Sequence, residues 1–443
     1  MKNIKWLVVE WVVLFSVLSC TFEYEEYDKK QTVSDMKSFA SEIVIREKNI
    51  SYAAIYDFYV EGNILYIPGR GITAYDLEEK KVKWEKDDSD LFKGKSTTAW
   101  PFHLSAEYIF LAASKGPWIA VVDKNTGETL QIIEFSDPQI LAWGENLYFY
   151  NNSLFFCGGD IRSGYSVYTK NGLYRLDLTN LKKKDGNEIY YIGEIQPIFQ
   201  YPRNSCAITG IHGDGKYGYL AWYPVNSNRY PGDPGKPFGI ACIDLETGET
   251  VWEDNQYNPG TGGRIKAITD KYVFATVTEE GTPRGRGGTG VYYKEKRDGS
   301  QLKNVLWYVW SSDTNFTWDR EGKRIYLASG ANTDSNPLVA AIICIDAEEG
   351  MVIWKRFRSA QEPQIGMQPQ VRNGVLYQVT SRYLELYDAQ TGNPLGRDRS
   401  VSGDPLNIGD TAVWNDILIF QGYEDLFGVK MNWKIENGAL VKE

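Results

Sequence analysis

Six aspartates recur along the 443-residue chain, each at the end of a short apolar run. They are Asp76, Asp123, Asp177, Asp244, Asp346 and Asp388, with successive spacings of 47, 54, 67, 102 and 42 residues. Grouped carboxylates could act as general acids and bases or bind a hard cation. Each aspartate, however, opens a turn, where its side chain can accept hydrogen bonds from backbone N–H groups two residues on. We therefore expect these carboxylates to build turns rather than a catalytic site.

The other residues capable of chemistry are sparse. The only histidines, His103 and His212, lie far apart in sequence without an HExxH or HxH context, and two histidines cannot supply the usual histidine-rich metal site. The glycine-rich stretch from Gly281 to Gly290 lacks the GK[ST] ending of a phosphate-binding loop and reads as a hairpin loop. The sequence therefore predicts no catalytic residue, no cofactor and no metal.

The cysteines match neither a zinc pattern nor a CxxC redox motif. Cys242 and Cys344 lie within apolar runs, where we expect small core residues. Cys157 and Cys206 could form a disulfide in an oxidising compartment, and the sequence does not decide whether they do.

The elements that carry the aspartates form a repeat. Its fullest copy, "IDLETGETVW" (243–252), reads as the end of a strand, a tight Asp–Gly turn and a second strand bearing a tryptophan. An upstream strand pair completes a unit of four strands, A to D, and eight units can be counted. The positions that define the repeat are Asp76, Trp84, Asp123, Asp177, Asp244, Gly248, Trp252, Trp307, Asp346, Trp354 and Asp388.

A repeat of this length, rich in aromatic residues and glycine turns, predicts an all-β fold, with each unit forming one blade of a propeller. The motif resembles the PQQ-type β-propeller repeat, in which an apolar residue, Asp, Thr-Gly and Trp follow at fixed spacing. We expect a single propeller of eight four-stranded antiparallel blades, and a ring of seven blades is the second option. The competing fold is a string of β-sandwich domains. The strand-like segment 41–47 should pair with the last blade and close the ring, and the terminal "NGALVKE" should add one short strand there.

The N-terminus carries a targeting segment. Two lysines precede the apolar run "WLVVEWVVLFSVLS", which ends at Cys20. The sequence "VLSC" resembles a bacterial lipobox, so we expect a signal peptide over 1–19, lipidation of Cys20 and an acidic tether over 20–40 before the propeller at 41–443. An uncleaved anchor is the alternative. The implied location is the bacterial envelope, and we expect a lipid anchor in the outer membrane, on its periplasmic or its surface face.

Long connections between strands B and C mark units three to six. All such connections should emerge on one face of a propeller, where loops on a rigid scaffold commonly carry recognition. Aromatic and arginine side chains in and beside them are typical of interfaces. The candidate partner-binding residues are Tyr165, Tyr168, Trp222, Tyr223, Arg229, Tyr230, Arg284 and Arg286. Neutral surface insertions are the alternative interpretation.

Two functions remain open at the level of sequence. The formal charge of −10 without a basic block excludes nucleic acid as a favoured partner. Proteins with the repeat that this chain resembles include quinoprotein dehydrogenases and also cofactor-free lipoproteins of the outer-membrane β-barrel assembly machinery (BamB-like). Because the chain lacks the adjacent cysteine pair common in those enzymes, we favour a non-enzymatic scaffold that binds an envelope protein. A propeller that binds a glycan or small molecule, or acts with PQQ or a metal, is the alternative.

Overall fold

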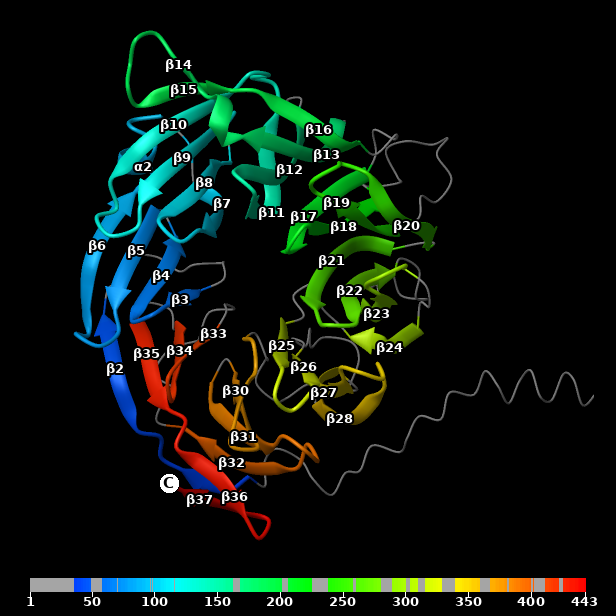
Figure 1. The fold of residues 1–443 in the computed structure, drawn as a ribbon. Helices are drawn as coiled ribbons and strands as arrows, with labels where there is room; N and C mark the ends of the chain where they lie inside the picture. The colour runs from blue at the N-terminus through cyan, green and yellow to red at the C-terminus, as the bar shows by residue number, and fades with distance from the viewer. Residues whose placement is uncertain are drawn as a thin grey trace, which may run out of the picture.

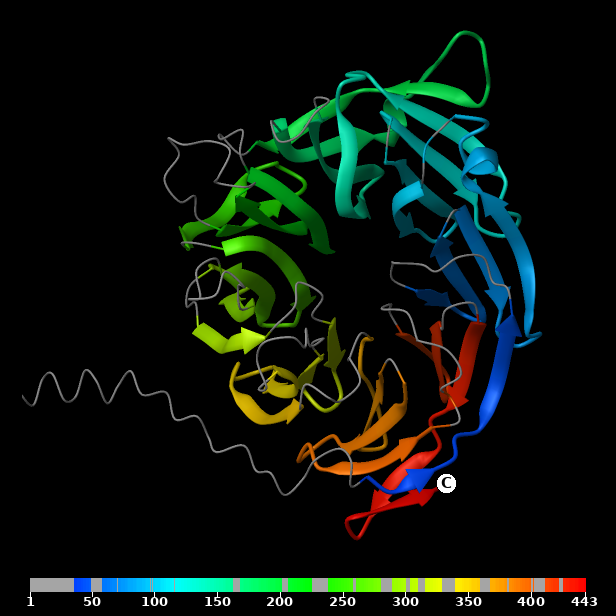
Figure 2. The same ribbon diagram turned by 180° about the vertical axis from the view of Figure 1, so that it is seen from behind.

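The computed structural model describes residues 36–48, 58–69, 71–95, 97, 99–114, 116–161, 168–200, 206–224, 238–257, 260–279, 289–299, 303–309, 315–328, 339–358, 367–380, 382–399, 401, 411–421 and 425–443. Within these residues the only helical pieces are α2 (Asp88–Leu91) and the 3-10 turn η2 (Leu178–Asn180). All other regular structure is β-strand, and the strands surround a common centre (Figures 1 and 2). The predicted all-β propeller fold is confirmed.

The described strands form eight sheets of four to six strands, numbered here in chain order, and one separate hairpin. Sheet 1 holds β3 (Tyr59–Glu61), β4 (Ile64–Gly69), β5 (Gly71–Asp76) and β6 (Lys81–Asp87). Sheet 2 holds β7 (Ala99–Leu104), β8 (Tyr108–Ala113), β9 (Trp118–Asp123), β10 (Thr129–Phe135), β14 (Lys182–Lys183) and β15 (Tyr190–Gly193). Sheet 3 holds β11 (Leu141–Tyr150), β12 (Ser153–Ile161), β13 (Tyr168–Asp177) and β16 (Ile195–Gln200). Sheet 4 holds β17 (Cys206–Asp214), β18 (Tyr217–Pro224), β19 (Phe238–Asp244) and β20 (Thr250–Tyr257).

The second half of the chain repeats this order. Sheet 5 holds β21 (Gly260–Ile268), β22 (Tyr272–Glu279), β23 (Thr289–Glu295) and β24 (Lys303–Val309). Sheet 6 holds β25 (Asn315–Asp319), β26 (Arg324–Ala328), β27 (Val339–Asp346) and β28 (Val352–Arg358). Sheet 7 holds β29 (Gln370–Arg372), β30 (Val375–Val379), β31 (Leu384–Asp388), β32 (Pro394–Asp398) and β1 (Ser38–Phe39). Sheet 8 holds β33 (Thr411–Trp414), β34 (Ile417–Gln421), β35 (Asp425–Lys430) and β2 (Ile43–Lys48).

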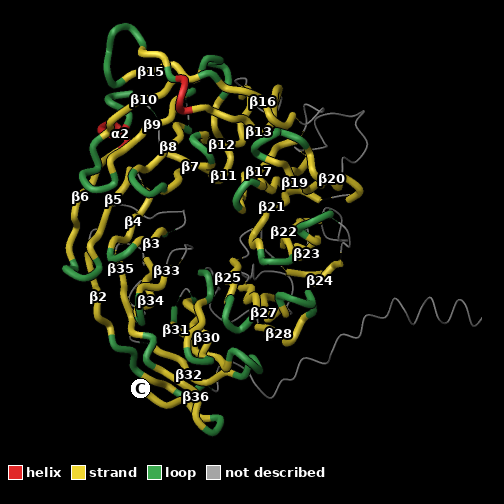
Figure 3. The backbone as a smooth tube through the Cα atoms, in the orientation of Figure 1, coloured by secondary structure: helices red, strands yellow, loops and turns green. Residues whose placement is uncertain are grey.

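The four-strand unit has the expected order. Strands A to D follow one another in sequence and pair antiparallel, as β3 to β6 do, with A toward the centre of the ring and D at its rim (Figures 1 and 3). Strands B and C are the most buried because they are covered on both faces: β5 and β30 contain only buried residues. Apolar clusters fill the seams between neighbouring sheets, for example between sheets 1 and 2 and between sheets 2 and 3.

The N-terminal segment closes the ring. Strand β2 pairs antiparallel with β35 and becomes the outer strand of sheet 8, as expected from the alternating pattern of 41–47. Ile45 is buried on Gly428 in this pair. Strand β1 adds in parallel to β32, so Ser38 and Phe39, assigned to the tether from sequence, belong to sheet 7.

The repeat predicts that strand D directly follows the turn that each aspartate opens, and this prediction was wrong for Asp177. The segment after Asp177 does not form strand D of its own sheet: Lys182–Gly193 folds back as a hairpin, and β15 pairs in parallel with β10 of sheet 2. Its tip, Asp185 and Gly186, has positive φ at both residues, as a tight hairpin requires. Strand D is instead β16.

The C-terminus also differs from expectation. Residues Trp433–Glu436 (β36) and Ala439–Lys442 (β37) pair with each other as a separate hairpin instead of entering sheet 8. The hairpin packs its apolar side chains on the core shared by sheets 7 and 8, with Trp433 edge-on to Phe39 at 5.3 Å between ring centroids. Because β2 already occupies the outer position of sheet 8, the terminal strand is not needed there.

Candidate functional site

The recurring aspartates are engaged by their own turns. In each of the six turns the Asp Oδ1 accepts backbone N–H groups two or three residues on, for example from Asn125 and Thr126 to Asp123 at 2.8 and 2.9 Å. These bonds favour the charged form, so the N–H of Thr126 lowers the pKa of Asp123 below its usual range. The Lys216 ammonium similarly lowers the pKa of Asp244, to which it donates at 2.8 Å. This arrangement gives the carboxylates a structural role.

The repeat tryptophans join neighbouring sheets. The indole Nε1 of Trp84, Trp252 and Trp354 donates to a carbonyl in the C–D turn of the next sheet, at 3.0–3.1 Å. Each ring also lies against the turn glycine of that sheet, where a Cβ would come within 2.6 Å of the ring at Gly127 and Gly299. The glycine is therefore required by its positive φ and by the indole packed on it.

Other members of the repeat complete these seams. A tyrosine on strand B lies 6.1–6.2 Å from each of these tryptophans, measured between ring centroids. In the strand register, a small residue on strand C pairs with both the tyrosine and the tryptophan. Cys242 and Cys344 occupy that small-residue position, and burial raises the pKa of each thiol to about 12. Gly248 meets Ile198 rather than an indole. Trp307 lies in β24, and its side chain is outside the described residues, as is that of Cys206.

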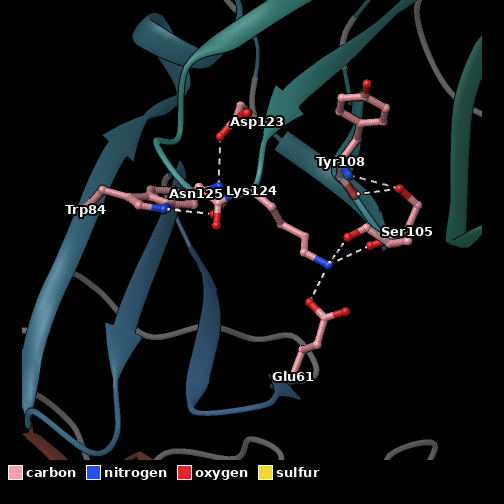
Figure 4. A network of polar contacts seen from close by, with 8 residues as sticks. Glu61, Trp84, Ser105, Tyr108, Asp123, Lys124 and Asn125 are labelled. Carbon is pink, nitrogen blue, oxygen red and sulfur yellow. Dashed lines mark hydrogen bonds and ion pairs between the residues drawn. The ribbon is translucent and has the colours of Figure 1, made fainter.

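A lysine in the C–D turn bridges two of the seams; it is buried at Lys124 and half-buried at Lys296. Lys124 follows Asp123, and its Nζ donates to the carbonyls of Ser105 and Ala106 at 2.7 and 3.0 Å and contacts the carboxylate of Glu61 in sheet 1 (Figure 4). Its own carbonyl accepts Trp84. Lys296 repeats this arrangement between sheets 4 and 5, with Asp214 as the carboxylate. The lysines thus connect the A–B turns of neighbouring sheets at the edge of the ring where the C–D turns also lie.

The candidate partner-binding residues fall mainly outside the described structure. Five of these residues belong to connections that lie outside the described residues, namely 162–167, 225–237, 280–288 and 329–338. They are Tyr165, Arg229, Tyr230, Arg284 and Arg286. Tyr168 and Tyr223 lie at strand ends in β13 and β18, and their side chains are not described. In sheets 3 to 6 the end of strand B and the start of strand C are described, and both lie at the edge of the ring opposite the C–D turns. The four B–C connections therefore leave from and return to that one edge.

The assignment of Trp222 to that surface was wrong. Its side chain is fully buried in the seam between sheets 3 and 4, where it lies 5.8 Å from the ring of Phe199 and directly over Gly239. The alternation of β18 points Trp222 inward, because Leu220 of the same face belongs to the same core. Trp222 therefore acts in packing.

Both histidines, by contrast, lie beside the same strand, β11, on the inner wall of the ring. His103 on β7 lies edge-on to Tyr148 on β11, 6.0 Å between ring centroids, and Asn146 on β11 lies 3.3 Å from Nε2 of His212 on β17. These are the first strands of sheets 2, 3 and 4, which face the centre (Figure 1). Burial lowers the pKa of His103, which favours a neutral imidazole at neutral pH. Sequence reasoning missed this group because the two histidines are 109 residues apart and only the ring brings their strands together.

This inner-wall group offers hydrogen-bonding side chains but not a metal site. Among the described residues no three His, Cys, Asp or Glu side chains lie close enough to hold a metal ion. In the same part of the chain, no helix has the length and apolar content needed to cross a membrane.

Comparison with known proteins supports the fold alone. No protein-family model and no curated protein matches the chain. Among solved structures, the quinohemoprotein alcohol dehydrogenase ADHIIG from Pseudomonas putida HK5 is similar with a TM-score of 0.55 and 10% sequence identity, over 90% of this chain and 77% of that one. This similarity shows the β-propeller fold. The dihydro-heme d1 dehydrogenase NirN, solved in complex with DHE, is similar with a TM-score of 0.50 and 12% identity, over 83% of this chain and 76% of that one.

Proposed function

We propose that this protein is a non-enzymatic propeller scaffold of the bacterial envelope, lipidated at Cys20, which binds a protein partner through the B–C edge of sheets 3 to 6. The proposal rests most on one observation: the described strand ends bring four long connections to the same edge of the ring. We infer that each of the eight sheets is one blade of the ring. A ring with an unbroken wall of sheets holds such connections at fixed separations, which favours binding without large rearrangement.

The chemistry of the described residues also favours a scaffold. The recurring carboxylates accept backbone N–H groups, and Asp76 and Asp244 additionally accept Asn63 and Lys216, so little of their hydrogen-bonding capacity is left for a ligand. The arginines of the candidate surface would offer bidentate partners to carboxylates on a binding protein. In a chain of net charge −10, Arg229, Arg284 and Arg286 would provide a local positive potential.

A second function is favoured by a separate observation, the inner-wall group of His103, Asn146, Tyr148 and His212. It suits hydrogen bonding to a glycan or another small polar ligand at the centre of the ring. The two similar solved structures named above are dehydrogenases, and this favours testing an enzymatic role as well. Thermal melts with a panel of sugars, comparing the parent with His212→Ala, would test it: stabilisation lost in the variant supports a ligand site, and no shift argues against it.

The scaffold is tested by capture from native membranes. The tagged full chain and its R284A/R286A double variant would be recovered in mild detergent, with thermal melts of both proteins. A true anchor residue costs about 2 kcal/mol or more when truncated, roughly a thirtyfold loss of affinity. We expect equal melting temperatures and strongly reduced recovery of one partner. Undiminished recovery would remove these loops as the binding surface.

A further inference from the structure

Two of the eight sheets carry an extra strand on the outer edge of strand D, at the rim of the ring (Figure 1). In sheet 2 this strand is β15, which pairs in parallel with β10, and in sheet 7 it is β1, which pairs in parallel with β32. Both extra strands come from outside the four-strand unit that they extend. The molecule therefore binds an extended segment at the rim of a sheet, and does so twice.

The two additions share one register. Strand D of each sheet contains a β-bulge, whose extra residue is Leu130 in β10 and Leu395 in β32. In both sheets the parallel pairing begins two residues after the bulge, at Ile132 and at Arg397. The backbone N–H of each of these two residues donates to the carbonyl just before the extra strand, at 2.6 and 2.8 Å. The bulge thus precedes an outward-facing N–H at a fixed position, where a parallel strand can pair.

Sheet 6 repeats the bulge, and its rim carries no extra strand in the described part of the chain. The bulge residue of β28 is Ile353, so the equivalent outward-facing N–H belongs to Lys355. Ile353 is 42% exposed, and Met351, two residues before it, is 57% exposed. Two aliphatic side chains therefore lie beside the open edge, and such an edge favours pairing with another strand.

The rims of sheets 1, 3 and 4 differ from this rim in ways that bear on pairing. In sheet 1 the bulge residue of β6 is an exposed lysine, Lys83, and a charged edge disfavours pairing. Strand β16 of sheet 3 contains Pro197, which has no N–H to donate. Sheet 4 has an exposed apolar bulge residue, Val251, but Glu253 stands where sheet 6 has Lys355. Sheet 4 would therefore select a strand of the opposite charge, and it supplies a matched control.

We propose that the outer edge of β28 binds an extended acidic segment of a partner protein as a fifth, parallel strand. β28 contains three basic residues and no acidic one, and Lys355, at the first pairing position, is exposed. Carboxylates on the incoming strand would complement this charge, and an apolar residue near its N-terminus would cover Met351 and Ile353. In this mode of recognition the main-chain hydrogen bonds supply affinity and alternate side chains supply specificity. The site lies on the rim, apart from the B–C edge of the proposed function.

Selection from a random peptide library displayed on phage tests the proposal, with the full chain as bait. We expect the recovered peptides to share an apolar residue followed by carboxylates, and to lack proline. A recovered peptide, labelled and titrated by fluorescence anisotropy, should bind I353E/K355E at least about tenfold more weakly than the parent, because both changes add charge that repels it. V251E, the same change at the bulge of sheet 4, should leave the affinity for the peptide unchanged.

A second measurement alters the peptide and leaves the protein as it is. Methylation of alternate backbone nitrogens of the peptide should abolish binding in one alternation and not in the other, since only one set of its N–H groups can pair with β28. This result holds even if I353E/K355E melts below the parent. A benzophenone at the N-terminus of the peptide should cross-link near Met351, as parallel pairing requires.

Several outcomes would overturn the site on β28. They are a selection that enriches no peptide or only peptides without carboxylates, equal affinity for the parent and I353E/K355E, and binding that survives both patterns of backbone methylation. A cross-link from the N-terminal benzophenone to the far end of β28 would overturn the parallel direction. The arginines altered in the capture experiment are unchanged here, so failure of this test is distinct from failure of the proposed function.

Discussion

At the scale of single residues, the tryptophans decide how sheets meet. Trp252 is 8% exposed, donates to Lys296 at 3.0 Å and packs on Gly299. We expect Trp252→Ala to destabilise the protein by about 3–5 kcal/mol, as for other large-to-small changes in a core. Thermal or denaturant unfolding would measure this, with Val251→Ala, 45% exposed on the neighbouring position, as the control. A melting temperature equal to that of the parent would disprove the structural role.

The turn aspartates predict an acid limit to stability. The pKa of Asp123 is lowered in the folded chain, above all by the N–H of Thr126, so its contribution is present above the unfolded pKa of about 3.9. That contribution is lost as the pH falls through the folded pKa. Asp123→Asn keeps an acceptor oxygen without the charge, so its deficit relative to the parent should be visible at pH 6 and shrink by pH 3. A deficit independent of pH, in melts at both values, would contradict this assignment.

At the scale of elements, ring closure depends on strand β2. Ile45 is 2% exposed and packs on Gly428, whereas the neighbouring Arg46 points outward with its side chain 52% exposed. We expect Ile45→Ala to cost about 2–5 kcal/mol and Arg46→Ala to cost at most about 1 kcal/mol, because the ion pair of Arg46 with Asp425 is exposed. Urea unfolding of both variants measures the difference. Similar costs for the two changes would show that β2 does not close the ring.

At the scale of the whole molecule, the expected absence of a cofactor can be tested. Since the recurring carboxylates are committed to turns, we expect PQQ with Ca²⁺ to leave the melting temperature unchanged. A ligand at 100 times its Kd stabilises the folded state by about 2.7 kcal/mol, a clear upward shift in a melt. Such a shift would favour ligand binding at the centre of the ring over the scaffold function. Comparing the shift of the parent with that of His103→Phe would show whether the inner-wall group contributes to this binding.

The sequence by itself determined the repeated unit. The Asp–Gly turn, the apolar run before it and the tryptophan after it depend on contacts within a few residues, or on a seam that recurs between sheets, so a single chain shows them plainly. The pairing of 41–47 with the last sheet was also predictable, because an alternating strand outside the repeat needs a partner edge. The excursion of Lys182–Gly193 to sheet 2 was not, since a C–D connection that contains its own hairpin reads like a strand D.

Only the tertiary structure decided which side chains meet. His103 and His212 approach the same strand because the ring places β7, β11 and β17 side by side. Trp222 stands beside a long connection in sequence yet is buried, because the alternation of β18 points it into a seam. The guanidinium groups of Arg397 and Arg399 both lie over the ring of Tyr383. They do so because the B–C connection of sheet 7 and the end of its strand D lie at the same edge of the ring. Each is a non-local contact, set by how strands pack and not by the order of residues along any one of them.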